Sequence, residues 1–282
     1  MSNSLEEGKD TELRYSYEGE SEINKLKSDL DNIFYTIDNN IYIAKSVKNA
    51  LVETFNVMRN YFSNVEKISK ALSDAYSVNN TKSILSNAIE LYANLGAINA
   101  MLRLMREYVK IDSNTQNIEK LTNRTITTIA LLIQIHIQHN ADKPDKVDNE
   151  IKSEMVKYKE LIDEIDEFID EDIDELKRQF EGDEDLTRGT YNVLSKALNL
   201  LEEYYYDNAF VFALNALDTD KASVALDRLV EAYASFSAFK ALYSVFCNGY
   251  NICVRHLEHR LDEALKGTKQ VIDKIVEYYI KS

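Results

Sequence analysis

The sequence predicts an all-α protein, and three observations support this class. The 282 residues contain 7 Gly and 1 Pro, where average usage would give about 20 and about 14. Sheets need turns that use these two residues, so β sandwiches, β barrels and Gly-rich nucleotide-binding folds are disfavoured. Apolar residues recur three and four positions apart over long stretches. With 45% hydrophobic and 29% charged residues, the composition is that of a globular chain.

The first element in the chain is an arm without periodicity. Residues 1–21 are predicted to form a disordered acidic arm, and residues 22–282 a single helical domain. Within that domain, helical spacing runs over 23–77 with no Pro or Gly. A straight helix of this length would reach about 80 Å. We therefore expect either a rod or a kink at Asn39-Asn40.

The rest of the domain predicts further long helices, over 82–137, 148–181, 187–217 and from 221 to 279. The only Pro of the chain, Pro144, marks the clearest break. Long helices joined by short turns fold back on one another, so we expect an elongated antiparallel bundle of long kinked helices. Self-similarity near 34 or 40–47 residues is missing, which argues against a helical-repeat solenoid.

The negative charge is concentrated in two segments. The formal net charge is -15. Residues 1–22 carry seven acids and two bases, and residues 148–185 carry seventeen acids and five bases. The remainder is nearly neutral and has no dominant basic stripe, so we expect no nucleic-acid partner.

The cysteines and the N-terminus predict a cytoplasmic protein. Cys247 and Cys253 are six positions apart on one predicted helix and do not share a face, so no disulfide is expected between them. The polar start of the chain lacks the features of a secretory signal. The longest apolar stretch, Thr125–Ile137, is too short to cross a bilayer.

Chemical motifs do not point to an enzyme. P-loop, GxSxG and CxxC patterns are absent. The pairs His136/His139 and His256/His259 lack further metal ligands at suitable spacing. An acidic run that resembles the start of an EF-hand has Glu175 where the loop needs Gly. We expect no catalytic residue, no metal site and no cofactor.

Basic residues on the second helix are candidates for a surface that meets an anionic membrane. Arg103, Arg106 and Lys110 are spaced to share one helical face, and two further bases extend the row. Two more lie near the predicted tip of the molecule. The candidate membrane-binding residues are Arg103, Arg106, Lys110, Lys120, Arg124, Lys143 and Lys146.

Three stretches resemble the BAR superfamily of crescent-shaped, membrane-binding dimers. The apolar pattern over 55–72 and 85–105 looks like helix one turning into helix two, and Phe246-Cys-Asn-Gly249-Tyr250 matches an aromatic-x-x-Gly-Tyr pattern of BAR domains that precede PH domains in GTPase-activating proteins. The resemblance implies a three-helix coiled coil that forms a homodimer. Residues expected at the dimer or core packing are Met58, Phe62, Val65, Leu95, Leu102, Leu229, Phe246 and Tyr250.

Four functions are open at this point. The resemblance favours a non-enzymatic, peripheral membrane scaffold that binds or senses curved membranes, with itself and weakly an anionic phospholipid membrane as partners. The alternative is a helical-bundle adaptor that binds a protein partner through its acidic faces, with no membrane role. A helical pore-forming protein would need Thr125–Ile137 to insert. A helical enzyme has no group of residues behind it.

Overall fold

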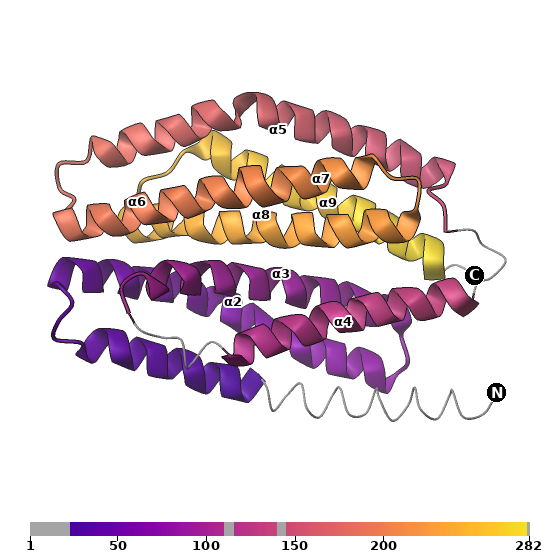
Figure 1. Ribbon diagram of the computed structural model, residues 1–282, viewed down its shortest axis with the longest axis horizontal. Coiled ribbons are helices and arrows are strands. Elements are labelled where there is room, and N and C mark those ends of the chain that lie inside the picture. Colours follow the sequence, from indigo (N-terminus) through magenta and orange to yellow (C-terminus); the bar gives the residue numbers. More distant parts are fainter. Residues whose placement is uncertain (1–22, 110–115, 140–144, 281–282) are drawn as a thin grey trace.

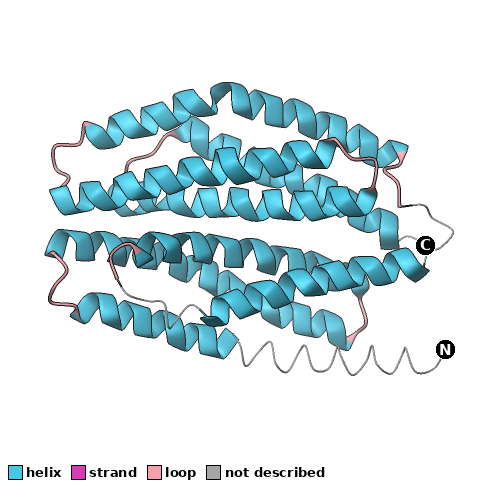
Figure 2. Ribbon diagram, in the orientation of Figure 1, coloured by secondary structure: helices cyan, strands magenta, loops and turns pink. Residues whose placement is uncertain are grey.

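The computed structural model describes residues 23–109, 116–139 and 145–280, and these ranges contain helices and no strand. The predicted all-α class is confirmed. The predicted arm over 1–21, Lys110 and Lys143 lie outside the described residues. After a helix over 23–39, the helices shown in Figures 1 and 2 are α2 (Lys45–Ser77), α3 (Thr81–Arg106), α4 (Gln116–His139), α5 (Asn149–Glu181), α6 (Arg188–Glu203), a π-helical segment η2 (Tyr204–Ala209), α7 (Phe210–Leu217), α8 (Ala222–Tyr250) and α9 (Arg255–Ile280).

Three of the predicted helices are each divided in two. The pattern over 23–77 breaks at residues 40–44, where the side chain of Asn40 accepts a hydrogen bond from the Tyr42 N–H at 2.9 Å and stabilises a turn. The pattern over 82–137 breaks after α3. The last one breaks after α8, where Asn251 takes a left-handed backbone conformation with φ 57°. α2 and α5, with 33 residues each, span about 50 Å, so the 80 Å rod considered from the sequence is wrong.

Side chains satisfy the free backbone N–H groups where several helices begin. Asn80 accepts a hydrogen bond from the Ser83 N–H at the start of α3, and Asp148 accepts one from the Ile151 N–H at the start of α5. The start of α8 has no such local cap. Asp145, from the segment before α5, accepts a hydrogen bond from the Ser223 N–H at 2.9 Å instead.

The helices form two layers that lie along the long axis of the molecule (Figure 1). One layer holds the helix over 23–39 with α2, α3 and α4, and the other holds α5 to α9. Each layer has the same order: an outer helix, a long second helix, a central helix and a last helix. The second helix of the later layer is the run from α6 through η2 to α7. The central helices, α3 and α8, pack against each other where the layers meet.

The two central helices also repeat one another in sequence and in bonding. Tyr92 on α3 donates a hydrogen bond to Glu231 on α8, at 2.8 and 3.0 Å, and Tyr233 on α8 donates one to Glu90 on α3, at 3.1 Å to both oxygens. Such reciprocal pairing is the mark of an interface with twofold symmetry. The contact between α3 and α8 thus has approximate twofold symmetry, and the same order of helices on both sides extends this relation to the layers. The matching residues, in the same spacing, are Glu90, Tyr92, Ala93, Ala97 and Ala100 of α3 with Glu231, Tyr233, Ala234, Ala238 and Ala241 of α8.

The core is continuous across both layers. α3 and α8 are apolar around most of their circumference because they are covered on several sides. Small residues let them approach: a Cβ on Gly96 would lie 3.3 Å from the carbonyl oxygen of Ala234. The packing residues predicted from the sequence lie inside a single chain, Tyr250 half-buried and the others buried, namely Met58, Phe62, Val65, Leu95, Leu102, Leu229 and Phe246.

The expectation of unpaired cysteines is wrong in this structure. Cys247 and Cys253 form a disulfide, with their Cα atoms 4.9 Å apart. The sequence argument placed both on one continuous helix, whereas α8 ends at Tyr250. The chain reverses at Asn251, where the N–H groups of Asn251 and Ile252 bond the carbonyls of Cys247 and Phe246 at 3.0 and 3.1 Å. This turn brings Cys253 back beside the last turn of α8.

Candidate functional site

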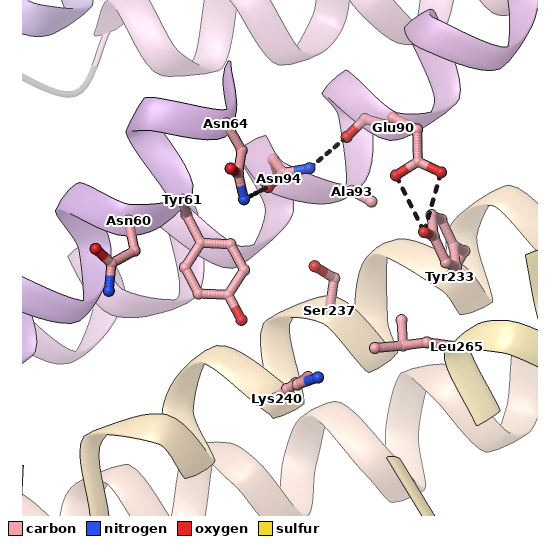
Figure 3. A pocket seen from close by; sticks show the side chains of 10 residues that line it. All are labelled: Asn60, Tyr61, Asn64, Glu90, Ala93, Asn94, Tyr233, Ser237, Lys240 and Leu265. Atoms are coloured by element: carbon pink, nitrogen blue, oxygen red, sulfur yellow. Dashed lines mark hydrogen bonds between the residues drawn. The ribbon is translucent and has the colours of Figure 1, made fainter. Parts of the chain in front are cut away.

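A pocket of about 350 Å³ opens where α2, α3, α8 and α9 converge (Figure 3). Its volume lies at the lower end of the range of small-molecule sites, roughly 300–1,000 Å³. The lining is mostly polar, and the side chains come from both layers. They are Asn60, Tyr61, Asn64, Glu90, Ala93, Asn94, Tyr233, Ser237, Lys240 and Leu265. We call this feature the four-helix pocket.

Short side chains on the central helices create the space. Ala93 on α3 and Ser237 on α8 line the pocket, and longer side chains at these two positions would fill it. Figure 3 shows the hydroxyls of Tyr61 and Ser237 directed toward the same space. Ser237 is 8% exposed, and within the described chain its hydroxyl meets no hydrogen-bond partner. Burial raises the pKa of Tyr61 to about 12, so its hydroxyl is protonated at neutral pH.

Full charges at the pocket are already balanced by neighbours. Glu90 accepts the Tyr233 hydrogen bond and lies 3.7 Å from the ammonium of Lys269. Burial, with the nearby Glu90 carboxylate second, raises the pKa of Tyr233. Lys240 forms an ion pair with Asp262. Each charged side chain of the pocket thus has an opposite charge beside it, and Lys269 is shared between Glu90 and Asp273, which lies 2.7 Å away.

The neutral polar groups form a short network on one wall. The amide of Asn64 donates to the Asn94 side-chain oxygen at 3.4 Å. The amide of Asn94 in turn donates to the backbone carbonyl of Glu90 at 2.8 Å. Asn94 is 9% exposed, so its orientation is held by these contacts. The wall presents fixed amide groups to whatever enters.

The internal repeat provides a second copy of this position. On the pocket side, the side chain of Tyr61 on α2 lies close to that of Ser244 on α8. On the other side, the side chain of Tyr204 in η2 lies close to that of Arg103 on α3. Ser244 and Arg103 hold matching places, counted from the Glu-x-Tyr triplets of their helices. A short serine thus stands where the other copy has a long arginine.

The residue before each tyrosine differs in the same way. Glu203 precedes Tyr204, and Asn60 precedes Tyr61. Arg103 binds both oxygens of Glu203, at 2.6 and 2.9 Å, so its side chain bridges the two helices. On the pocket side, Asn60 makes no such bridge to any residue that the structure describes.

The described residues of the predicted basic row differ in exposure and in their partners. Arg103 forms an ion pair with Glu203. The hydrogen bond to this carboxylate raises the pKa of the guanidinium, while burial acts in the opposite direction. Arg106 on α3 and Arg124 on α4 are half-buried, while Lys120 is exposed. Lys146 is exposed in the segment before α5.

The strongest charge feature is the outer face of α5. Residues 163–175 contain nine acids and no base. Asp172 is buried and pairs with Arg260 of α9, and Asp163 pairs with Lys159. Within the described chain, no ion pair involves the exposed acids Glu164, Glu167, Asp170, Glu171 and Asp174. We call these five residues the α5 acidic face.

An apolar pair is exposed at one end of the molecule. Ile41 is 84% exposed and Tyr42 is 92% exposed, in the turn between the helix over 23–39 and α2. Tyr35, on the preceding helix, is 68% exposed. Among the other described residues, Val78 at the opposite end of α2 is 71% exposed and Val156 on α5 is 59% exposed.

The described residues contain no cluster of His, Cys, Asp and Glu that could hold a metal ion. The side chains of His136 and His139 are not among those described. Helices of the described chain also lack a stretch long and apolar enough to cross a membrane.

Comparisons with protein-family models, with curated proteins and with solved structures found no match. The features of the molecule that point to a function are therefore the four-helix pocket, the α5 acidic face and the exposed pair Ile41 and Tyr42. The sequence analysis found the acidic segment but missed the four-helix pocket. The signal that could have revealed it is the Glu-x-Tyr-Ala repeat of α3 and α8, which is visible in the sequence. Which residues lie beside the two tyrosines depends on how the helices pair, and only the folded structure shows this pairing.

Proposed function

We propose that this protein is a non-enzymatic helical scaffold that binds a Lys- and Arg-rich segment of a protein partner along the α5 acidic face. The observation that carries the proposal is the row of five exposed carboxylates without a cation partner in the described chain. A basic segment would supply the missing counter-charges. Complementary charge of this kind raises association rates and selects partners.

The position of α5 supports this role. α5 is the outer helix of its layer (Figure 1), and its apolar side packs on α9, α7 and α6. Its fold-stabilising contacts therefore lie on the side away from the acidic face. Tyr206 of η2, 37% exposed, donates a hydrogen bond to Asp170 at the edge of this face. An exposed aromatic ring beside a charged strip suits an interface.

The test is a selection of peptides from a random display library on the full-length immobilised protein. Enriched peptides should carry several Lys or Arg residues. Their affinity should fall at least tenfold for the variant E164Q/E167Q/E171Q, which removes three charges from one helical face. The control variant D31N/D38N/D74N removes three exposed charges from the other layer and should bind as the unmodified protein does. The affinity should also fall as salt is raised.

Two results would overturn this function. One is a selection in which no peptide is enriched over the blank surface. The other is a set of enriched peptides whose affinity is the same for the α5 variant and for the unmodified protein. Circular dichroism and thermal unfolding of both variants check that they are folded.

A homodimeric, BAR-like peripheral membrane scaffold is the second candidate, and the exposed pair Ile41 and Tyr42 favours it. Adjacent apolar side chains this exposed mark an interaction site or a membrane contact. Inserted in the headgroup region, they would anchor one end of the molecule. Scattering that gives twice 32.5 kDa and a radius of gyration well above about 19 Å would support an elongated dimer.

Vesicle sedimentation tests the membrane contact directly. The full-length protein should sediment with vesicles of phosphatidylcholine and phosphatidylserine, and the variant I41D/Y42D should not. Val78→Asp is the matched control, because it places a charge at the other end of α2. Failure of the unmodified protein to sediment, or equal loss for Val78→Asp, would reject this candidate.

A further inference from the structure

We propose that the four-helix pocket binds a small neutral polyhydroxy molecule, a monosaccharide or polyol. This site is separate from the α5 acidic face, and neither proposal depends on the other. The pocket draws on four helices of both layers and has a volume of about 350 Å³. Ligand sites of helical bundles commonly lie between helices in this way and use polar groups to orient the ligand.

The two copies carry different side chains at the positions beside this pocket. On the counterpart side, the Arg103 side chain on α3 binds Glu203 at the end of α6 and bridges the helices. On the pocket side, Ser244 and Asn60 occupy the matching places, and both are too short to bridge. The side chains that bridge the helices in one copy are thus replaced by short ones beside the pocket in the other. A polar cavity holds water, which a ligand with suitable hydrogen-bonding groups can replace.

The charge balance determines the class of ligand. Glu90 has Lys269 and the Tyr233 hydroxyl beside it, and Lys240 has Asp262. A charged ligand would therefore enter with no free counter-charge and would lose its hydration without compensation. A neutral ligand avoids this cost.

The free polar groups favour hydroxyls. Asn60 and Asn64 offer amide groups that each contain a donor and an acceptor, and Ser237 offers a hydroxyl that has no partner among the described residues. A sugar hydroxyl both donates and accepts, so it can satisfy each of these groups. The ring of Tyr61 and the side chain of Leu265 supply an apolar surface for the C–H face of a sugar ring.

The test uses a variant that places beside the pocket a salt bridge of the kind that the protein already has on the counterpart side. The double substitution N60E/S244R reproduces on the pocket side the Glu203–Arg103 bridge of the counterpart. It should therefore fold, which thermal unfolding checks. The control N56E/N248R makes the same residue changes at exposed positions of α2 and α8 outside the pocket.

The probes are D-glucose, D-galactose, D-mannose, D-ribose and myo-inositol, measured by saturation-transfer NMR with the full-length protein. At least one should receive saturation from the unmodified protein and from N56E/N248R. Its affinity should fall at least tenfold for N60E/S244R. No transfer to any probe would overturn the proposal, as would undiminished binding by the closed variant. Stronger binding of glucose 6-phosphate than of glucose would overturn the assignment of a neutral ligand.

Discussion

Tyr92 on α3 donates a hydrogen bond to Glu231 on α8 at 2.8 Å, and the same two residue types bond in the opposite direction between Tyr233 and Glu90. These pairs lie on either side of the approximate twofold axis between the layers. They link helices that are about half the chain apart in sequence. The pair Tyr233 and Glu90 also lines the four-helix pocket, beside which the two copies carry different side chains.

Removing the Tyr92 hydroxyl from these reciprocal pairs should destabilise the protein. In Tyr92→Phe, Glu231 loses its donor in a half-buried place, where burial already raises its pKa. A hydrogen bond to a charged group contributes roughly 1.5–3 kcal/mol, and we expect the free energy of unfolding at pH 7 to fall by about this amount. Denaturation in urea measures it. Tyr35→Phe, at a side chain 68% exposed, should change stability by less than about 0.5 kcal/mol. Equal effects would contradict the assignment.

Asp145 should make stability depend on pH in the acid range. Burial by itself would raise its pKa, but hydrogen bonds from Ser223 and Tyr279 outweigh burial and hold the pKa below the ordinary value of 3.8. A carboxyl with a lowered folded pKa stabilises the fold above its unfolded pKa, and this stabilisation is lost as the pH falls through the folded pKa. Asp145→Asn should therefore melt at a lower temperature at pH 7.

The difference between Asp145→Asn and the unmodified protein should shrink as the pH falls below about 4. Melting temperatures measured from pH 7 to strongly acid conditions would show this. The exposed Asp38→Asn variant is the control and should follow the unmodified curve. Parallel curves for Asp145→Asn and the unmodified protein would refute the role of this carboxylate.

Arg103 should matter for stability as well as for surface charge. Arg103→Glu would replace a bidentate ion pair with two facing carboxylates, because Glu203 lies 2.6 Å from the guanidinium. We expect a loss of about 1–2 kcal/mol in the free energy of unfolding. Lys120→Glu, at an exposed base of α4, should leave stability unchanged. If Arg103→Glu is as stable as Lys120→Glu, the bridge does not form in solution.

The disulfide between Cys247 and Cys253 can be checked by mass. Protein purified and denatured without reductant should resist alkylation at both sulfurs, and reductant should make both reactive. Cys253→Ser should lower the free energy of unfolding by about 2 kcal/mol, because the bond closes a short loop in the unfolded chain. Full alkylation before reduction would show that the thiols are free, as the sequence analysis expected.

The sequence alone was sufficient for the class of fold and for most helix positions. Scarcity of Gly and Pro and an unbroken apolar period depend on local physics, since each residue's spacing determines the face it buries. The same period predicted which residues lie in the core, such as Met58 and Leu229. It also located the acidic helix, because charge content is a property of the segment itself.

Tertiary structure decided which helices meet and where the last one breaks. The sequence offered a kink at Asn39-Asn40, where the chain does break, but the break after Tyr250 leaves little trace in a periodic pattern, because Asn can either continue a helix or turn the chain. The disulfide follows from one of these turns. The four-helix pocket depends on α2, α3, α8 and α9 coming together, and on Ser244 standing opposite Tyr61. A sequence states which side chains exist, but the space between them is a property of packing, which only the folded chain determines.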